Sequence, residues 1–344
     1  MNWPSLSIII PSFNQGSYIE RTILSIVKQE YEGELQVIVS DGGSKDETVE
    51  VLKKYPQITW WSEPDKGFVD AVTKGFAVAK GEILAIQSSD DFYLRNAFKV
   101  SVRELINDEK LGIVTGCDVL LQPDLKSFST SNLESGYVTP SSLLLERCIP
   151  QHCAFFRKDI LAKIGGLRKE VDTCADMDFW YRALHFYKGK FIPFYTAAYQ
   201  RHANQRTKVL NNWSTSFLRM VESCESDPFY SSQFKLSEED KKNWYVRCEV
   251  FWELNSGAKD KNKKQIMQKI NEVLESSDYT SETKRDVYRS GASHGIIIEQ
   301  KNTMDLNTYV SNSLINGTLL KKSRKKLYQG VGVLKSNVDI NWWK

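Results

Sequence analysis

The chain has 344 residues, 41% of them hydrophobic, which is enough for one full domain and a smaller attached unit. Its formal charge of +3 combines an acidic first part with a basic second part: residues 1–204 carry a net charge of −3 and residues 205–344 a net charge of +6. The basic residues of the second part are spread out rather than gathered in one stripe, which argues against nucleic acid as a partner.

The cysteines and the apolar runs bear on the cellular compartment. The six cysteines form no CxxC pair and no cluster with zinc-ligand spacing, so we expect reduced thiols. The amino terminus, MNWPSLSIII, lacks the basic region and long apolar stretch of a signal peptide. Nowhere do about 18 apolar residues, the length of a membrane-spanning helix, follow one another. We therefore expect a cytoplasmic protein, peripheral to a membrane at most.

Strand and helix patterns alternate over the first 90 residues. Four short runs of β-branched or apolar residues are typical of strands buried on both faces, at residues 6–10, 35–40, 58–62 and 82–88. Three helical patterns lie between them, two of which open with the Ser-x-x-Glu spacing of a capping box: from Ser17, from Ser44 and over about residues 67–79. Such alternation predicts an α/β fold, a mainly parallel central sheet flanked by helices.

The second part of the chain has a different pattern. From about residue 208 it consists of long, charged, helix-like stretches without strand alternation, so we divide the chain into a domain of residues 1–207 and a helical region of residues 208–344. The segment LLKKSRKKLYQG at 319–330 combines apolar and basic positions suited to the surface of an anionic membrane. A solvated helix face and a helix-mediated homo-oligomer are the alternatives.

The residues that follow the predicted strands are polar or acidic. They are PSFN (11–14), DGGS (41–44), EPDKG (63–67) and SDD (89–91). Ligands of open parallel sheets bind beyond the carboxyl ends of the strands, so these residues are expected to share one crevice. Adjacent carboxylates there can hold a hard divalent cation that also binds substrate phosphates. A nucleoside diphosphate with Mg²⁺ or Mn²⁺ fits such a site.

Asp90 and Asp91 are adjacent, and neighbouring residues of a strand point to opposite faces. One of them can therefore reach a metal while the other meets a sugar hydroxyl. We assign Asp91 to the metal and Asp90 to the ribose of the nucleotide. The alternative is that SDD only caps a following helix.

Together these segments resemble the family 2 glycosyltransferases of the GT-A fold. The similar stretches are SIIIPSFNQGSYIERTILSIVKQ, VIVSDGGSKDET, EPDKGFVDAVTKGFAVAKGEILAIQSSDD, QHCAFFRKDILAKIGGL, CADMDFWYRA and YQRHANQRT, within about residues 5–207. The resemblance implies transfer of a sugar from a nucleotide sugar, with a UDP-sugar favoured, to an acceptor hydroxyl. It also implies inversion at the anomeric carbon, Mn²⁺ or Mg²⁺ as cofactor, and a glycan or lipid-linked acceptor in the assembly of a surface polysaccharide or glycoconjugate.

The resemblance assigns nucleotide-sugar-binding residues in the PSFN segment. Phe13 is similar to an aromatic residue that packs on the base, and Pro11 and Ser12 supply backbone contacts. Asn14 belongs to the same segment. The alternative for Phe13 is a place in the hydrophobic core.

Further site residues follow from the other segments. Asp41 matches the acid that reads the edge of the base, and Asp65 the acid after the third strand. His202 matches a histidine near the metal and the diphosphate, with a structural role as the alternative. His152 lies in the stretch that lines the acceptor side in the family, and it could equally serve packing.

The catalytic base of the family belongs to an acidic pair that opens a helix, which ADMDFWYRAL resembles, although Ala175 stands where Glu is common. Asp176 and Asp178 differ by two residues, about 200° around a helix, so they cannot share a face. Asp176 has i, i+4 spacing to the apolar Trp180, whereas Asp178 has the spacing to pair with Arg182. An apolar wall raises the pKa of a carboxylate toward a value useful for accepting a proton. We assign Asp176 as the base; a buried helix cap is the alternative.

Two other functions fit the sequence less well. A nucleotidyltransferase of similar topology needs a Gly-rich, Lys-bearing phosphate loop after the first strand, and PSFNQGSY has one Gly and no Lys. A non-catalytic sugar-nucleotide or polysaccharide-binding module that kept the GT-A fold is the second alternative. The presence of all four acids argues against it: Asp41, Asp90, Asp91 and Asp176.

Overall fold

The computed structural model describes residues 2–121, 123, 128–130, 135–145, 148–202, 205, 213–233, 237–255, 260–279, 283–284, 287 and 342. Internal contacts divide the chain into two compact units, Met1–Lys241 with Asn341–Lys344, and Lys242–Ile340. The first unit thus continues beyond the boundary that we predicted at residue 207. The basic segment 319–330 lies outside the described residues.

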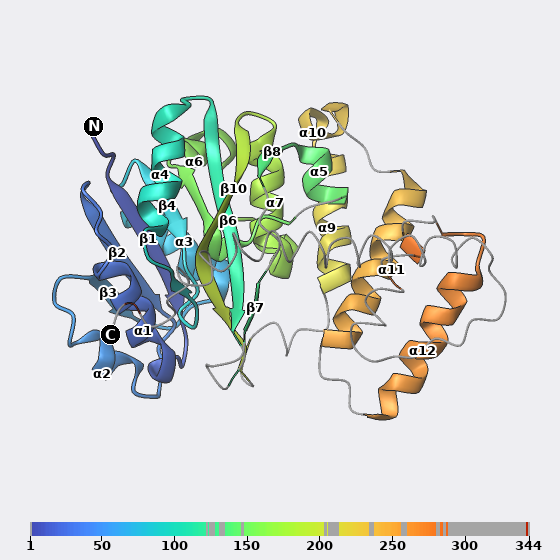
Figure 1. Ribbon diagram of the computed structural model, residues 1–344, viewed down its shortest axis with the longest axis horizontal. Helices are drawn as coiled ribbons and strands as arrows, with labels where there is room; N and C mark the ends of the chain where they lie inside the picture. Colours follow the sequence, from blue (N-terminus) through green and yellow to red (C-terminus); the bar gives the residue numbers. More distant parts are fainter. Residues whose placement is uncertain are drawn as a thin grey trace, which may run out of the picture. The chain divides into compact units, whose positions relative to one another are not determined.

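The described strands of the first unit form one sheet (Figure 1). Their bounds are β1 Leu6–Ser12, β2 Leu35–Asp41, β3 Thr59–Ser62, β4 Ile83–Ile86, β5 Phe92–Tyr93, β6 Leu111–Leu121, β7 Phe128–Thr130, β8 Gly136–Val138, β9 Ala154–Arg157 and β10 Lys188–Gln200. The spatial order is β3-β2-β1-β4-β9-β6-β10-β5, with β7 beside β6 and β8 beside β10. The strands β3, β2, β1 and β4 are parallel, as predicted, and β9 adds an antiparallel pairing with both β4 and β6.

Helices cover both faces of this sheet. Those of the first unit are α1 Gly16–Val27, α2 Thr48–Leu52, α3 Phe68–Val78, α4 Ala97–Asn107, α5 Pro140–Leu145, α6 Asp159–Ile164, α7 Ala175–Leu184, α9 Trp213–Ser226 and α10 Pro228–Gln233, with 3₁₀ segments at Gln151–Cys153 and Lys169–Cys174. The helix α11, Glu238–Asn255, crosses the boundary between the units, and α12 spans Asp260–Glu275. The α/β fold with flanking helices is therefore confirmed.

The three predicted helices of the first 80 residues are present, but two of their starts differ from the prediction. The helix α1 begins at Gly16, and the Ser17 hydroxyl donates to Glu47 in the next loop instead of capping its own helix. The helix α2 begins only at Thr48, and the Ser44 hydroxyl donates to Asp41. Both serines therefore bind the loops around the strand ends, because tertiary partners there outcompete local capping.

Alternating residues of β1 face two helical layers. Leu6, Ile8 and Ile10 lie in the core cluster that α1, α2 and α4 cover. Ile9 points to the other face, where α3 approaches so closely that a Cβ on Gly75 would lie 2.4 Å from its side chain. This contact sets the distance between α3 and β1, and with it the position of the helix start, at Phe68, beyond the strand end.

The strand order reverses between β1 and β4, which are parallel neighbours although β2 and β3 precede β4 in the chain. Such a topological switch point opens a crevice outside the carboxyl ends of the two strands. Residues 11–13 end or follow β1, and residues 88–91 follow β4. The sheet therefore delivers two of the predicted site segments to the same crevice.

The second unit has a core of its own. Its buried side chains come mainly from α11 and α12 and comprise Val246, Val250, Ile266, Ile270, Val273 and Val287.

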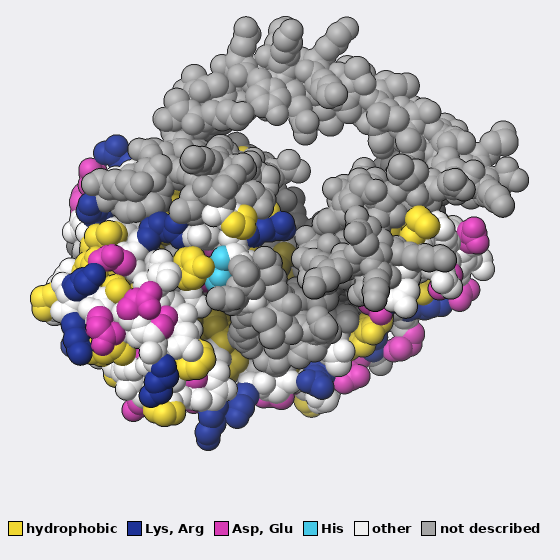
Figure 2. All heavy atoms as spheres, turned by 90° about the horizontal axis from the view of Figure 1, so that it is seen from below, with side chains coloured by type: hydrophobic (Ala, Val, Ile, Leu, Met, Phe, Trp, Pro, Cys, Tyr) yellow, Lys and Arg dark blue, Asp and Glu magenta, His cyan; other side chains and the backbone are white. Residues whose placement is uncertain are grey.

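In the described part of the chain, no helix combines the length and apolar character needed to cross a bilayer. On the molecular face in Figure 2, acidic, basic and hydrophobic side chains are interspersed over the described residues.

Candidate active site

A cavity of about 520 Å³ opens at the switch point. We call it the switch-point cavity; its walls are Pro11, Ser12, Phe13, Gln15, Gly42, Asp65, Gly67, Phe68, Ala71, Ser88, Ser89 and Asp90. These residues come from the ends of β1 and β4, the loops after β2 and β3, and the start of α3. Five of the predicted binding residues thus share one cavity, namely Pro11, Ser12, Phe13, Asp65 and Asp90.

Phe13 is 59% exposed, so it is not part of the hydrophobic core. The next residue, Asn14, has a left-handed backbone with φ of 52° and does not line this cavity. Its backbone N–H donates to Ser44 Oγ at 2.7 Å, and its side-chain oxygen accepts from the Lys45 N–H at 2.9 Å. Asn14 therefore holds the turn that presents Phe13, which is an indirect role compared with the predicted contact to the ligand.

Asp41 also has a role that differs from the prediction. Its side chain is buried, with 1% exposure, and it lines neither cavity. The carboxylate accepts hydrogen bonds from the Ser44 N–H at 2.9 Å, the Gly43 N–H at 3.2 Å and the Ser62 hydroxyl at 2.6 Å. With these partners Asp41 fixes the loop after β2, and the structure does not present it to the edge of a base.

Asp65 faces the same loop from the opposite side. Its carboxylate accepts a hydrogen bond of 2.7 Å from the Gly67 N–H. A Cβ on Gly42 would lie 2.8 Å from Asp65 Oδ2, so a residue with a side chain at position 42 would displace this carboxylate. The absence of a side chain at Gly42 therefore leaves room for Asp65 in the cavity wall.

His202 and Asp90 meet although 112 positions separate them in the sequence. His202 Nε2 lies 2.8 Å from Asp90 Oδ2, and the imidazole ring stacks on Tyr18 at 4.3 Å. His202 is 5% exposed, and its Nδ1 has no hydrogen-bond partner within the described structure. We paired His202 with Asp91 as metal ligands, but the structure places it on Asp90.

Asp91 is buried, with 1% exposure. One carboxylate oxygen accepts from the Gln200 N–H at 3.0 Å. Burial, together with the neighbouring charge of Asp90, raises the pKa of Asp91 to about 8. Arg21, which the sequence analysis missed, lies over the Phe92 ring and supplies positive charge near both acids; burial lowers its pKa to about 10. Arg21 lies inside a helical pattern and not at a strand end, so the strand-end signal did not single it out.

These residues fit part of a divalent-cation site. Asp90 and His202 lie together, and a cation would offset the repulsion between the two neighbouring carboxylates. Within the described residues, however, no three His, Cys, Asp or Glu side chains form a group that could hold a metal ion. Mg²⁺ and Mn²⁺ sites often complete their shells with substrate phosphate oxygens and water, and such sites can have only one or two protein ligands.

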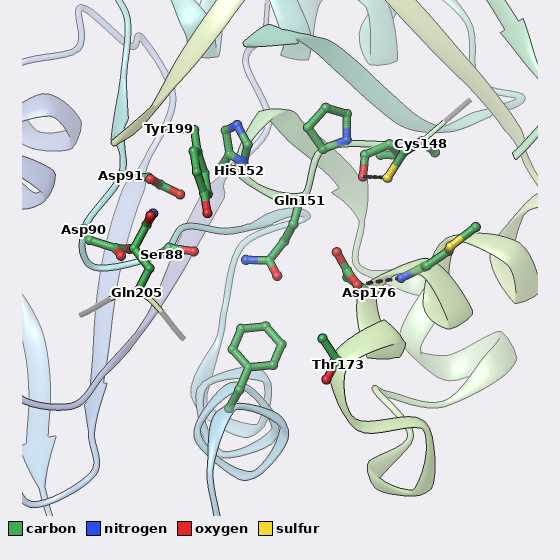
Figure 3. Close-up of a pocket in the computed structure, with 14 residues that line it drawn as sticks. Ser88, Asp90, Asp91, Cys148, Gln151, His152, Thr173, Asp176, Tyr199 and Gln205 are labelled. Atoms are coloured by element: carbon green, nitrogen blue, oxygen red, sulfur yellow. Dashed lines mark hydrogen bonds between the residues drawn. The ribbon is translucent and has the colours of Figure 1, made fainter. Parts of the chain in front are cut away.

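A second cavity, of about 320 Å³, adjoins the first (Figure 3). We call it the α7 cavity; its walls are Phe68, Ser88, Asp90, Asp91, Cys148, Ile149, Pro150, Gln151, His152, Thr173, Asp176, Met177, Tyr199 and Gln205. Phe68, Ser88 and Asp90 line both cavities. A ligand that enters the switch-point cavity can therefore extend toward Asp176.

The two acids of α7 lie on different faces of the helix, as predicted, but Asp178 is the buried one, whereas we expected the inward, apolar surroundings for Asp176. Asp178 is fully buried and accepts from Arg182 Nε at 2.8 Å and from Arg168 Nε at 3.0 Å. Asp176 is only half-buried and lines the α7 cavity in the first turn of the helix. The predicted Asp178–Arg182 pair is confirmed, and Asp176 is the acid of the two that can meet a ligand.

The α7 cavity contains residues that we did not predict. Tyr199 and Gln205 flank His202 in YQRHANQ, so their proximity to a predicted site residue was the available signal. His152 lies 3.5 Å from Asp118 and 5.6 Å, between ring centres, from Tyr199. It lines the cavity while only 9% exposed, and its role on the acceptor side stays a prediction.

Comparison with known proteins links this geometry to a family. The model of the family described as glycosyl transferase family 2 matches residues 7–165. An uncharacterized glycosyltransferase of Mycobacterium tuberculosis is 32% identical over 189 residues, which cover 52% of this chain and 69% of that protein. The chondroitin synthase of Pasteurella multocida is 26% identical over 219 residues, 62% of this chain and 22% of the synthase.

Solved structures share the fold at low sequence identity. Residues 1–349 of TarS from S. aureus, in complex with UDP-GlcNAc, superpose with a TM-score of 0.54 at 13% identity and cover 84% of this chain and 88% of that chain. The mannosyltransferase PcManGT from Pyrobaculum calidifontis, in complex with GDP-Man and Mn²⁺, gives a TM-score of 0.53 at 14% identity, covering 100% of this chain and 88% of that chain. With its α/β sheet, its switch-point cavity and these relatives, the chain belongs to glycosyltransferase family 2.

Proposed function

We propose that this glycosyltransferase moves a sugar from a nucleotide sugar, with a UDP-sugar favoured, to an acceptor hydroxyl, with inversion and with Mn²⁺ or Mg²⁺ as cofactor. The observation that carries the proposal is the continuity of the two cavities. One has the exposed Phe13 and the other has Asp176, and they meet at Phe68, Ser88 and Asp90. A nucleotide sugar that lies across this junction directs its anomeric carbon toward the α7 cavity, which contains Asp176, the proposed general base.

The switch-point cavity suits the nucleotide part of the donor. An exposed aromatic ring offers a stacking surface that a base can use without disturbing the core. Asp65 adds a hydrogen-bond acceptor in the same wall. The fold relative TarS is in complex with UDP-GlcNAc, which supports a UDP-sugar as the first donor to try.

The cation belongs at the junction of the cavities. Asp90 and His202 would hold Mn²⁺ or Mg²⁺ there, with the buried Asp91 behind them adding negative charge. When bound, such a cation stabilises the charge that develops on the departing diphosphate. Complexation of PcManGT with Mn²⁺ supports the choice of metal for this chain.

Asp176 is suited to act as the general base. An acceptor hydroxyl in the α7 cavity would transfer its proton to the Asp176 carboxylate while its oxygen forms a bond to the anomeric carbon. The bond from that carbon to the diphosphate oxygen breaks on the opposite side, and its electrons leave with the nucleoside diphosphate. Attack opposite the leaving group inverts the anomeric configuration.

The acceptor is proposed from the relatives. Chondroitin synthase supports a glycan acceptor, and thus a role in polysaccharide or glycoconjugate assembly, although this chain spans only 22% of that enzyme. A lipid-linked acceptor would agree with our expectation of a cytoplasmic protein that contacts a membrane through residues 319–330. Homo-oligomerisation through the same region is the competing proposal, and release of the protein from anionic vesicles by salt would distinguish the two.

The decisive experiment separates nucleotide binding from turnover. We expect the protein with Mn²⁺ to bind UDP in isothermal titration and to release UDP from a UDP-sugar of a donor panel. Asp176→Asn should lower turnover by about 10²- to 10⁴-fold because it removes the general base, while the Kd for UDP stays within about twofold.

Two outcomes would contradict the proposal. Equal losses of UDP affinity and turnover in Asp176→Asn would mean that Asp176 supports the fold or the nucleotide instead of accepting the proton. Tight binding of a nucleotide sugar by the unaltered protein with no release of nucleotide to any acceptor would indicate a binding module.

A further inference from the structure

The wall of the α7 cavity includes a side-chain carboxamide that forms no hydrogen bond with the described residues. Gln151 lines the cavity and is half-buried. Within the part of the chain that the structure describes, no group forms a hydrogen bond with its side-chain amide. Figure 3 shows this amide pointing into the space between Ser88 and Asp176.

The backbone around Gln151 is held firmly. It opens the 3₁₀ segment Gln151–Cys153, which the Cys153 N–H closes with a 2.9 Å bond to the Pro150 carbonyl. The next two side chains are buried: His152 lies against Asp118, and the Cys153 thiol donates to the Cys117 carbonyl at 3.4 Å. Gln151 and His152 both line the cavity, but His152 is buried against Asp118, whereas the Gln151 amide points into the open space.

Gln205 provides a contrast within the same cavity wall. Its amide N–H₂ donates to the Gln200 carbonyl at 2.7 Å, and its amide oxygen accepts from the His202 N–H at 3.2 Å. Both ends of that side chain are therefore used by the protein itself, in a loop that carries His202. Gln151 is more exposed than Gln205, and its amide, without a protein partner among the described residues, remains available to a ligand in the cavity.

The position of Gln151 indicates which part of the donor its amide would contact. The transferred sugar must bridge the diphosphate near Asp90 and the acceptor hydroxyl near Asp176, so it has to pass the space into which Gln151 points. A sugar hydroxyl is both a donor and an acceptor, and a carboxamide matches it with an N–H₂ and a C=O at no cost in charge. Asp90 and Asp176 in the same wall are carboxylates, which only accept when ionised, so neither offers a hydroxyl both a donor and an acceptor.

We propose that Gln151 binds a hydroxyl group of the transferred sugar and so helps to set the donor-sugar specificity. This inference rests on the proposed function, because it requires the sugar of a nucleotide sugar to occupy the α7 cavity. The residue acts on substrate binding and takes no part in proton transfer. A site that hydrogen-bonds a hydroxyl also disfavours sugars that present that hydroxyl in another orientation, since the amide then stays unpaired.

The test compares each nucleotide sugar with its own free nucleotide. Isothermal titration in Mn²⁺ is run with UDP-GlcNAc, UDP-glucose, UDP-galactose and GDP-mannose, each beside UDP or GDP. Gln151→Met keeps the length of the side chain and removes the amide. We expect it to weaken binding of the best nucleotide sugar by about 5- to 10-fold, the effect of one lost hydrogen bond, and to leave the free nucleotide within about twofold.

Two further variants keep the result interpretable. Gln151→Glu retains an accepting oxygen but no N–H₂ donor, so it is expected to restore part of the loss only if the sugar hydroxyl donates. Gln205→Met breaks bonds within the protein, so it should lower the melting temperature and weaken nucleotide and nucleotide sugar alike. A Gln151→Met protein with this second pattern would overturn the inference, as would one that binds every ligand as the unaltered protein does.

The proposed function fails in a different way. If the unaltered protein binds neither UDP nor GDP in Mn²⁺, the donor site itself is wrong and the role of Gln151 falls with it. If it binds them and Gln151→Met leaves the preference among the four sugars unchanged, the donor site stands and only the role of Gln151 is rejected.

Discussion

The two cavities differ in how the chain builds them. The switch-point cavity is lined by residues that end or directly follow parallel strands, together with the first turns of α3, all within the first 90 residues. The α7 cavity combines that edge with residues 148–152, the start of α7 and the end of β10. The first is a consequence of sheet topology, whereas the second exists only when distant segments pack correctly.

Because of this difference, substitutions in the two cavities should affect different properties, ligand binding in the first and stability in the second. Changes at the rim of the switch-point cavity should affect ligands with little cost to folding, because its main aromatic residue is exposed. The α7 cavity depends on charges buried behind its wall, where Asp178 joins Arg168 and Arg182. Arg182 in turn donates to the Ile164 and Gly166 carbonyls at 2.6 and 2.8 Å. The Asp178 carboxylate therefore holds the arginine that connects α7 to the end of α6 and the loop after it.

Asp178→Asn should have the largest effect on stability. The substitution keeps the shape but leaves the buried Arg182 and the half-buried Arg168 without a counter-charge, so we expect the free energy of unfolding to fall by about 3 to 5 kcal/mol. Urea denaturation measures the change. In protein that remains folded, turnover should fall more than UDP affinity, because Asp176 shares the helix.

A surface pair provides the matched control for this prediction. Arg95 and Glu30 lie 3.4 Å apart with both side chains more than 60% exposed, and Glu30→Gln should cost less than about 1 kcal/mol. Similar losses in Asp178→Asn and Glu30→Gln would show that the α7 wall does not depend on its buried charges.

Phe13→Ala should have the next largest effect. We expect it to weaken UDP binding without lowering the stability of the protein. Loss of a stacked ring is expected to weaken UDP affinity by about 10- to 30-fold in isothermal titration, with the melting temperature nearly unchanged because the side chain is 59% exposed. Tyr137→Ala is the control: that ring is 57% exposed and lies outside both cavities. If the two variants bind UDP equally well, Phe13 is not the stacking residue.

The fold was predictable because its signals are local. The strands of the first 90 residues are continuous apolar runs, and the helices between them have clear apolar spacing, so β1–β4 and α1–α3 follow from the sequence. The antiparallel insertion of β9 between β4 and β6 was not predictable in this way. It depends on which strand edge is free once the parallel part has formed.

The site was predictable only in its list of residues. Strand ends and the family resemblance identified Phe13, Asp65, Asp90 and Asp176, which line the cavities. The sequence could not show that the loop hydroxyls enclose Asp41. Contacts of this kind join residues far apart in the chain, and no periodicity records them.

Asp91→Asn should have the smallest of the predicted effects, a pH-dependent change in the free energy of unfolding. The pKa of Asp91 in the folded protein, about 8, is above its value of about 3.9 in the unfolded chain, so the folded state retains a proton that the unfolded state releases. The stability of the unaltered protein without metal therefore falls as pH rises from about 4 to 8, and Asn removes this cost. Urea unfolding in EDTA should show Asp91→Asn gaining on the unaltered protein as pH rises over this window.

The response to cations and to a control completes that test. Mn²⁺ should shrink the advantage of Asp91→Asn at pH 8, because a cation near Asp90 and His202 offsets the same charge. Asp70→Asn should show no gain as pH rises, since the backbone N–H of Lys66 lowers the pKa of that exposed carboxylate. An advantage of Asp91→Asn that stays constant with pH would mean that Asp91 is ionised throughout. Its charge would then be balanced by Arg21, and the shared rim of the two cavities would need no cation for its stability.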